Sequence, residues 1–176
     1  MDIALNKTVT AYANGGSTIS GTISDIVNGT PNPDGTPWST STNAWWTGTA
    51  PYLTITLGAN YSIQAFTVQA DDNDTYEVDY WNSATSSWTL AYAVPEQYTT
   101  QGGLQTRPTY TLSTPIVTDQ LKVFATTGDG SYAIGQVYAM GTLAATPEPA
   151  CTLLLASVAA LATCAERRNR RRTGRG

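Results

Sequence analysis

The densest group of chemically capable side chains lies in the stretch QADDNDTYEVDYW, residues 69–81. Its polar cluster comprises Asp71, Asp72, Asn73 and Asp74, followed by Glu77 and Asp79. Three hypotheses fit these residue types on a loop between two strands. The loop is a solvated turn whose Asp and Asn side chains cap their own backbone, a calcium site built from closely spaced oxygens, or a sugar site that bonds to vicinal hydroxyls. A hydrolytic carboxylate pair is compatible in composition, but crowding into one loop gives no sign that two carboxylates face each other across a substrate.

Aromatic residues and one arginine could supply the other half of a sugar site. Aromatic rings stack on the apolar face of a pyranose, while Arg and Asp hold its hydroxyls. Trp45 and Trp46 are adjacent, so in an extended chain they point in opposite directions and we expect one to be exposed. Arg107 is the only arginine before the tail, and it either pairs with an acidic loop residue or holds a ligand. The predicted ligand-binding residues are Trp45, Trp46, Asp72, Asn73, Asp74, Tyr98 and Arg107.

Two features of the composition exclude classes of function. Histidine is absent from the whole chain, which removes the commonest general base and the favoured zinc ligand. We therefore expect a protein that is not an enzyme. Up to residue 146 the chain holds eleven acidic residues against three basic ones, Lys7, Arg107 and Lys122. A body this acidic would repel nucleic acid, so no nucleic-acid partner is expected.

Strands, and not helices, are expected to position these residues. Before residue 146, stretches rich in Thr, Val, Ile, Tyr and Trp alternate with Gly, Pro, Asn and Asp, a pattern typical of an all-β sandwich or barrel. The sequence 127–130, Thr-Gly-Asp-Gly, predicts a turn. Residues 13–50 are expected to form a long loop. The predicted strands cover residues 52–58, 62–70 with an irregular alternation near Ala65, 75–81, 87–94, 120–126 and 131–141.

The body resembles the discoidin-like family, the galactose-binding-type β-sandwich also known from the C domains of coagulation factors. The resemblance covers roughly residues 3–142 and is carried by IALNKTVTA, by DIVNGTPNPDGTPWST (25–40), by PYLTITLG with Thr56 where an Asp is common, and by LKVFATTGDGSYAIGQVYAMG. It implies a jelly-roll β-sandwich of about eight strands with ligand loops clustered at one end. It also implies a structural role for Trp38.

The same resemblance implies a function and a metal site. Families of this fold mostly bind carbohydrate, and some bind phospholipid or protein. Many hold a structural calcium near an Asp-Gly-Asp turn, closed by a Glu of the last strand. Here the turn reads Asn28-Gly29-Thr30 and the Glu position reads Gln136, so the charge available to a hard cation is reduced. The implied calcium ligands are Asp25, Asn28, Thr30 and Gln136, with Asp34 as an alternative carboxylate.

The tail TPEPACTLLLASVAALATCAERRNRRRTGRG, residues 146–176, differs from everything before it. As a helix its apolar run would span about 24 Å, short of a ~30 Å hydrocarbon core. The arginines that follow can snorkel and hold that end on the cytoplasmic side. We therefore divide the chain into a sandwich (1–143), a linker (144–149), a short transmembrane-type helix (150–166) and an Arg-rich cytoplasmic tail (167–176).

The order of these features resembles the PEP-CTERM sorting signal. The matching residues are Pro147, Glu148, Pro149, the apolar helix, and Arg167, Arg168, Arg170, Arg171 and Arg172. The resemblance implies processing by an exosortase, transient insertion in the inner membrane, and a final place in the cell envelope or outside the cell. Such a route requires a signal peptide. The start MDIALNKTVTAYANGG does not resemble one, so we expect the reading frame to continue upstream of Met1.

Taken together, the sequence predicts a secreted or cell-surface protein that binds carbohydrate, with the exopolysaccharide of a biofilm matrix as the expected ligand. The alternative is a structural or adhesion protein of the matrix that contacts other proteins and holds no glycan.

Overall fold

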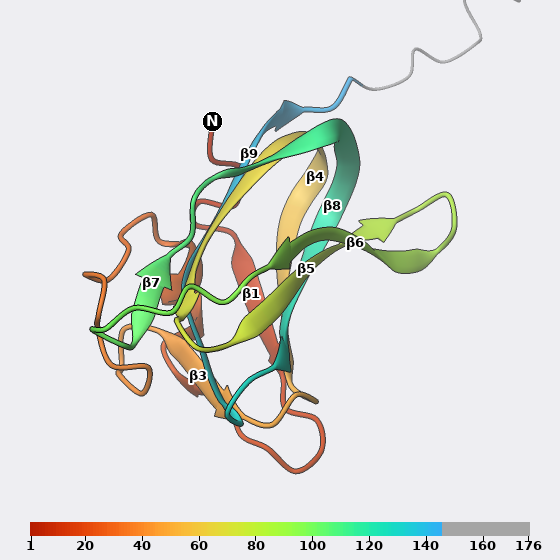
Figure 1. Cartoon of the computed structure of the whole chain (residues 1–176). Helices are drawn as coiled ribbons and strands as arrows, with labels where there is room; N and C mark the ends of the chain where they lie inside the picture. Colours follow the sequence, from red (N-terminus) through yellow and green to blue (C-terminus); the bar gives the residue numbers. More distant parts are fainter. Residues whose placement is uncertain (146–176) are drawn as a thin grey trace, which may run out of the picture. The chain divides into compact units, whose positions relative to one another are not determined.

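Antiparallel strands build the part of the chain that this computed structural model describes, residues 1–145 (Figure 1). Hydrogen bonds join the strands in the order β2-β3-β9-β4-β8-β5-β6, with β1 and β7 each paired to β4. The elements are β1 (Thr8–Tyr12), β2 (Ser20–Gly21), the 3-10 helix η1 (Ile23–Val27), β3 (Ala44–Thr47), β4 (Tyr52–Asp71), β5 (Thr75–Asn82), β6 (Ser87–Val94), β7 (Leu104–Thr106), β8 (Tyr110–Thr127) and β9 (Ser131–Leu143).

Long, bent strands turn this ladder into two packed layers. β4 is 20 residues long. Its first half pairs with β1 and with the second half of β8. Its second half pairs with β9, β7 and the first half of β8. The register shifts between Thr56 and Tyr61, around Gly58, whose φ of 84° suits glycine. The strand therefore bends there and belongs to both layers.

Several sequence predictions are confirmed, and two are wrong. The strand 87–94 and the turn 127–130 lie where they were expected, and a register shift between Ile63 and Ala65 accounts for the irregular alternation. The stretches 52–58 and 62–70 are not two strands, because β4 runs through both without interruption. The long segment 13–50 contains β2, η1 and β3, so it is more ordered than a loop. The described residues form nine strands, in keeping with the expectation of about eight.

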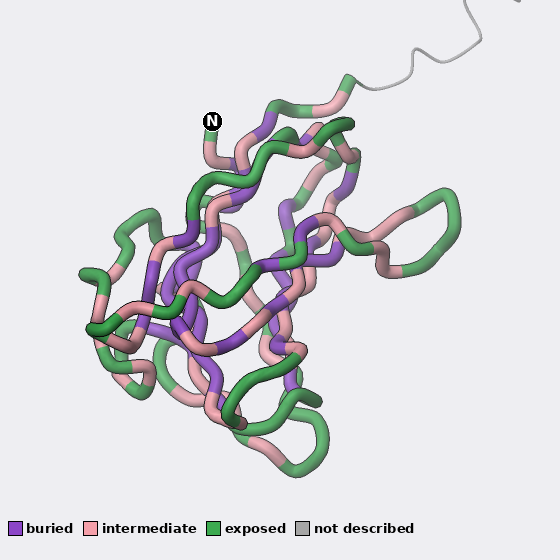
Figure 2. Tube along the Cα trace, in the orientation of Figure 1, coloured by how far each residue is buried: buried purple, intermediate pink, exposed green. Residues whose placement is uncertain are grey.

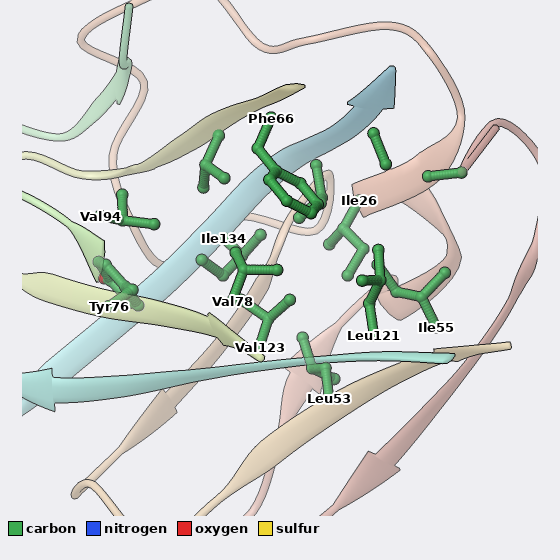
Figure 3. Packing of buried hydrophobic residues seen from close by; sticks show 14 of the residues in the cluster. Ile26, Leu53, Ile55, Phe66, Tyr76, Val78, Val94, Leu121, Val123 and Ile134 are labelled. Atoms are coloured by element: carbon green, nitrogen blue, oxygen red, sulfur yellow. The ribbon is translucent and has the colours of Figure 1, made fainter. Parts of the chain in front are cut away.

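The hydrophobic core lies between the two layers (Figure 3). Alternation in β4 buries Leu53, Ile55 and Leu57, as the sequence predicts. Phe66 from the second half of β4 is also fully buried, and each such side chain stabilises the fold by about 1.5–3 kcal/mol. Ile26 of η1 packs into the same cluster, so the short helix covers part of the core.

The two ends of the sandwich differ. The chain enters and leaves at one end, where Ile3 N–H donates to Ala139 O at 2.8 Å and Ala144 N–H donates to Asn60 O at 2.9 Å. At the other end lie the mostly exposed connections 13–19, 48–51 and 128–130 (Figures 1 and 2) and the more buried connection 72–74, and we call this the loop end. Within residues 1–145, no helix has the length and apolar character needed to cross a membrane.

Candidate functional site

The carboxylates of the β4–β5 connection are buried, which overturns the expectation of a solvated turn. Asp71 and Asp74 have relative exposures of 3% and 0%. Tyr76 Oη donates to Asp74 Oδ2 at 3.1 Å, and Asp129 N–H donates to Asp74 Oδ1 at 3.2 Å. A Cβ on Gly128 would collide with Asp74 Oδ1, so the β8–β9 turn fits around this carboxylate because position 128 is glycine. Asp74 thus holds the turn in place and is not available to a ligand.

Arg107 is a structural residue, which corrects the prediction that it holds a ligand. Its side chain is 1% exposed, and its guanidinium donates only to backbone carbonyls. The acceptors are Pro95 O (3.0 Å), Ala70 O (2.7 Å), Gln105 O (2.9 Å), Asp71 O (2.6 Å) and Asp74 O (3.4 Å). A guanidinium has five N–H donors, and all of them have partners. Arg107 therefore ties together the end of β4, the exit from β6 and the start of the β7 region.

This fastening leaves a small group of polar and aromatic side chains at the loop end, Asp72, Asn73, Tyr98, Thr99 and Asp129, which we call the loop-end cluster. Thr99 N–H donates to Asp72 Oδ2 at 3.2 Å, which holds Tyr98 beside the β4–β5 connection with 79% of its surface exposed. Asn73 Nδ2 donates to Asp129 Oδ2 at 3.0 Å. Asn73 Oδ1 and Thr99 Oγ1 are buried oxygens without a hydrogen-bond partner in the described structure. The cluster thus combines an exposed ring with the exposed carboxylate of Asp129, which can bond hydroxyls.

The two adjacent tryptophans do point in opposite directions, but only Trp45 is accessible. Trp46 faces the core, fully buried, with its ring edge-on to Tyr76 at 6.4 Å, so its prediction as a ligand-binding residue is wrong. Trp45 is half-buried on the outer side of β3 and makes a T-shaped contact with Trp38 at 5.4 Å. Among the described residues no hydrogen bond or ring contact joins Trp45 to the loop-end cluster.

The residues implied as calcium ligands include one carboxylate, Asp25. Asn28 Oδ1 accepts a hydrogen bond from Thr30 N–H at 2.7 Å, so this amide faces its own turn. Gln136 is fully buried and its amide has no hydrogen-bond partner, and no hydrogen bond connects it to Asp25. The part of the chain that the structure describes contains no group of three His, Cys, Asp or Glu side chains able to hold a metal ion. Within residues 1–145, neither this site nor the 71–74 loop therefore offers the several converging carboxylates that a hard cation prefers.

Burial sets the electrostatics of the loop end. Loss of solvation raises the pKa of Asp74 to about 7, although hydrogen bonds from Tyr76 and from Asp129 N–H act against the shift. Burial likewise raises the pKa of Asp71 to about 6, and the positive charge of Arg107 opposes it. Asp79 lies apart from this group, because it pairs with Lys122 at 2.9 Å in the one ion pair found within residues 1–145.

Sequence reasoning missed Thr99 and Asp129. Asp129 lies in the predicted turn 127–130, and an Asp between two glycines was the one available signal for it. Thr99 gave no signal, because its backbone N–H makes the contact to Asp72. The predicted sorting residues Pro147 to Pro149 and Arg167 to Arg172, and the predicted helix 150–166, lie outside the described residues.

Replacing Arg107 should destabilise the domain through geometry and not only through charge. Arg107→Met leaves several buried carbonyls without a donor, and we expect the free energy of unfolding to fall by about 3 kcal/mol or more. Arg107→Lys keeps the charge but cannot reach all five carbonyls, so it should be almost as unstable. Denaturant unfolding measures the free energy of unfolding of both variants. Lys7→Met, at a partly exposed cation, is the control; a mild Arg107→Lys effect would contradict this account.

Stability should fall as pH rises from about 4 to 7. In the unfolded chain these carboxyls titrate near 3.8, whereas in the folded chain the pKa values of Asp71 and Asp74 are about 6 and 7. Between these values the folded state binds more protons, so raising the pH favours unfolding. Denaturant midpoints measured across this range should decline, and Asp71→Asn should make the decline shallower. Asp25→Asn is the control, and an unchanged slope in Asp71→Asn would refute the argument.

Comparison with known proteins identifies the fold. No protein-family model matches the chain, and no curated protein matches it in sequence. Among solved structures, the family 32 carbohydrate-binding module of Streptococcus pneumoniae EndoD matches with a TM-score of 0.56 at 16% identity, over 80% of this chain and 99% of that one. A fucose binding module of Streptococcus pneumoniae gives a TM-score of 0.57 at 11% identity, covering 80% and 94%.

A third match is chitosan-binding module 2 of a chitosanase/glucanase from Paenibacillus sp. IK-5, solved with chitotriose. It gives a TM-score of 0.54 at 19% identity, covering 80% of this chain and 100% of that one. Identities this low establish the fold alone. The described domain therefore has the galactose-binding-like, antiparallel β-sandwich fold of the family 32 carbohydrate-binding modules, as the discoidin-like resemblance predicted.

Proposed function

We propose that this protein is a non-catalytic carbohydrate-binding protein and that the loop-end cluster is its glycan site. One observation carries the proposal: the segment with the exposed Tyr98 ring is bonded to the β4–β5 connection, where Asn73 is in turn bonded to the exposed carboxylate of Asp129. The sandwich that carries them has the fold of modules that bind sugars. An aromatic ring with hydrogen-bonding groups beside it is the usual composition of a sugar site.

The fixed shape of the loop end supports this role. Arg107 holds the backbone of the β4–β5 connection, and the Asp72 carboxylate holds Thr99. A ligand therefore meets side chains that are already in place, and little conformational entropy is lost on binding. The Tyr98 ring would stack on the apolar face of a pyranose, while Asn73 and Asp129 would bond its hydroxyls.

The charge of the body favours some glycans over others. Asp71, Asp72, Asp74 and Asp129 all lie around the loop end, and Arg107 is buried beneath them. Polyanionic glycans would be repelled, so neutral sugars and amino sugars are the expected ligands. Fucose, galactose and chitotriose, which are named for the modules of similar fold, are suitable probes, together with the exopolysaccharide of the host.

A specific surface favours the alternative function, adhesion to other proteins. Aromatic side chains lie on the outer side of the layer formed by β1, β4, β8, β5 and β6. Tyr12 stacks on Tyr52 at 4.6 Å, Trp81 lies edge-on to Trp88 at 5.5 Å, and Lys122 Nζ lies 4.4 Å from the centroid of the Phe124 ring. We call these residues the aromatic face. Sheet faces toward solvent are usually polar, and exposed apolar patches often mark contacts with partners.

Glycan binding by the loop-end cluster can be tested with Tyr98 variants. Tyr98→Ala should weaken retention on glycan-containing affinity gels roughly three- to tenfold, because an aromatic contact contributes about 0.5–1.5 kcal/mol. Tyr98→Phe keeps the ring and should bind like the wild type. Asn73→Ala should also weaken binding. Tyr110→Ala removes an exposed tyrosine outside the cluster and serves as the control.

Two outcomes would decide against this proposal. Unchanged retention in both Tyr98→Ala and Asn73→Ala would remove the loop-end cluster as the site. Loss of binding to matrix proteins in Trp88→Ser, with no glycan retained by any variant, would favour adhesion through the aromatic face.

We further propose that the tail delivers the protein to the cell envelope. The support is the order of Pro147-Glu148-Pro149, an uncharged apolar run and an arginine cluster, each in the place that a PEP-CTERM signal requires. An exosortase would cut near the Pro-Glu-Pro sequence after transient insertion in the inner membrane. The mature protein would then act in the envelope or in the biofilm matrix.

Processing can be tested by mass spectrometry. The full chain, expressed behind an export signal peptide in a bacterium that has an exosortase, should yield a product ending near Pro149. Glu148→Ala should leave the chain uncleaved in the membrane fraction, because the protease would no longer recognise its motif. Glu166→Ala changes a carboxylate outside the motif and should be cleaved normally. Equal cleavage of both variants would exclude sorting by this motif.

A further inference from the structure

We infer that the amide of Gln69 takes the place of a cation beneath the loop 28–43, so that this loop is fastened to the sandwich without metal. The inference concerns the calcium site that the discoidin-like resemblance implies. The ligands named for that site do not converge in the structure. A different residue, on β4, gathers the oxygens of the loop.

Gln69 is fully buried and both ends of its amide have partners. Its Oε1 accepts from Asn32 N–H at 3.0 Å, and its Nε2 lies 2.7 Å from Asn32 O. The same nitrogen also lies 3.2 Å from Asp34 Oδ1 and 3.0 Å from Thr106 Oγ1. Three oxygens, two from the loop 28–43 and one from β7, thus surround one nitrogen. This arrangement is the one a bound cation would impose, with a neutral NH2 group at its centre.

Asp34 is the only carboxylate in this group, and its Oδ1 atom is already occupied. Besides Gln69 Nε2, it accepts from Thr106 N–H at 3.0 Å and from Thr106 Oγ1 at 2.9 Å. A calcium ion takes six to eight oxygen ligands, and here the oxygens point at N–H and O–H donors. Hydrogen bonds from Gln69 and Thr106 stabilise the negative charge of the Asp34 carboxylate. A bound cation is not needed for this.

The neighbouring strand β9 makes room for the amide and adds no charge. Gln69 is paired with Gln136, whose amide makes no hydrogen bond. Next to it, a Cβ on Gly135 would collide with Gln69 Oε1. The glycine therefore leaves space for the Gln69 side chain, and the glutamine supplies no carboxylate that would attract a metal ion.

Backbone hydrogen bonds connect the loop held by Gln69 to another part of the chain. Gly35 N–H donates to Leu104 O and Leu104 N–H donates to Thr36 O, both at 2.8 Å, so the loop held by Gln69 is hydrogen-bonded to the start of β7. Tyr98 and Thr99 precede this strand by a few residues in the chain. Chelating groups, such as the carboxylates of an anionic polysaccharide, would not loosen this contact.

The test uses the full chain and measures stability and loop protection. The thermal midpoint of the wild type should be the same in EDTA and in calcium chloride. Gln69→Leu should lower the midpoint and speed hydrogen exchange of the Asn32 amide roughly tenfold or more, because that N–H loses its acceptor. Gln136→Leu, the matched control on the paired strand, should do neither, since its amide has no partner to lose.

Three results would overturn the inference. These are a midpoint that falls in EDTA, a midpoint that rises with calcium, and unchanged exchange of the Asn32 amide in Gln69→Leu. None of the readouts involves sugar, so failure here would leave the glycan proposal standing, and loss of glycan binding elsewhere would leave this one intact.

Discussion

The loop end depends on one buried cation that has no carboxylate as its direct partner. Arg107 is bonded to carbonyl oxygens from three separate segments, and those carbonyls would otherwise lack donors in a buried region. Its charge also offsets part of the cost of burying Asp71 beside it. A single side chain thus sets the backbone path of the β4–β5 connection and allows carboxylates to lie beneath the surface there.

Local patterns in the sequence predicted much of the fold, because the side-chain period of a strand can be read from neighbouring residues. The inward row Leu53, Ile55 and Leu57 and the irregularity at Ala65 are of this kind. The continuity of β4 could not be read from neighbouring residues. It depends on partners far along the chain, on both sides of the bend near Gly58. The short strand β7 likewise exists only because it pairs with the end of β4.

The site was harder to predict than the fold, because its contacts join distant residues. Composition identified the 71–74 stretch, but it could not show that Tyr76 and the turn at Asp129 would enclose Asp74. Alternation predicted that one of the two adjacent tryptophans would be exposed, and the packing of the layers decided that it is Trp45. Gln69 looked like an ordinary strand residue, since nothing near it in sequence reveals its contacts to Asn32 and Thr106.

The position of the chain ends has a consequence for a tethered protein. Residues 3 and 144 are bonded to backbone at the same end of the sandwich, next to Ala139 and Asn60, while Tyr98 lies at the other end. If the domain were attached to a surface through its C-terminal side, the body of the sandwich would therefore lie between that surface and the loop-end cluster. The proposed glycan site would then face away from the attachment point, and the attached surface would not cover it.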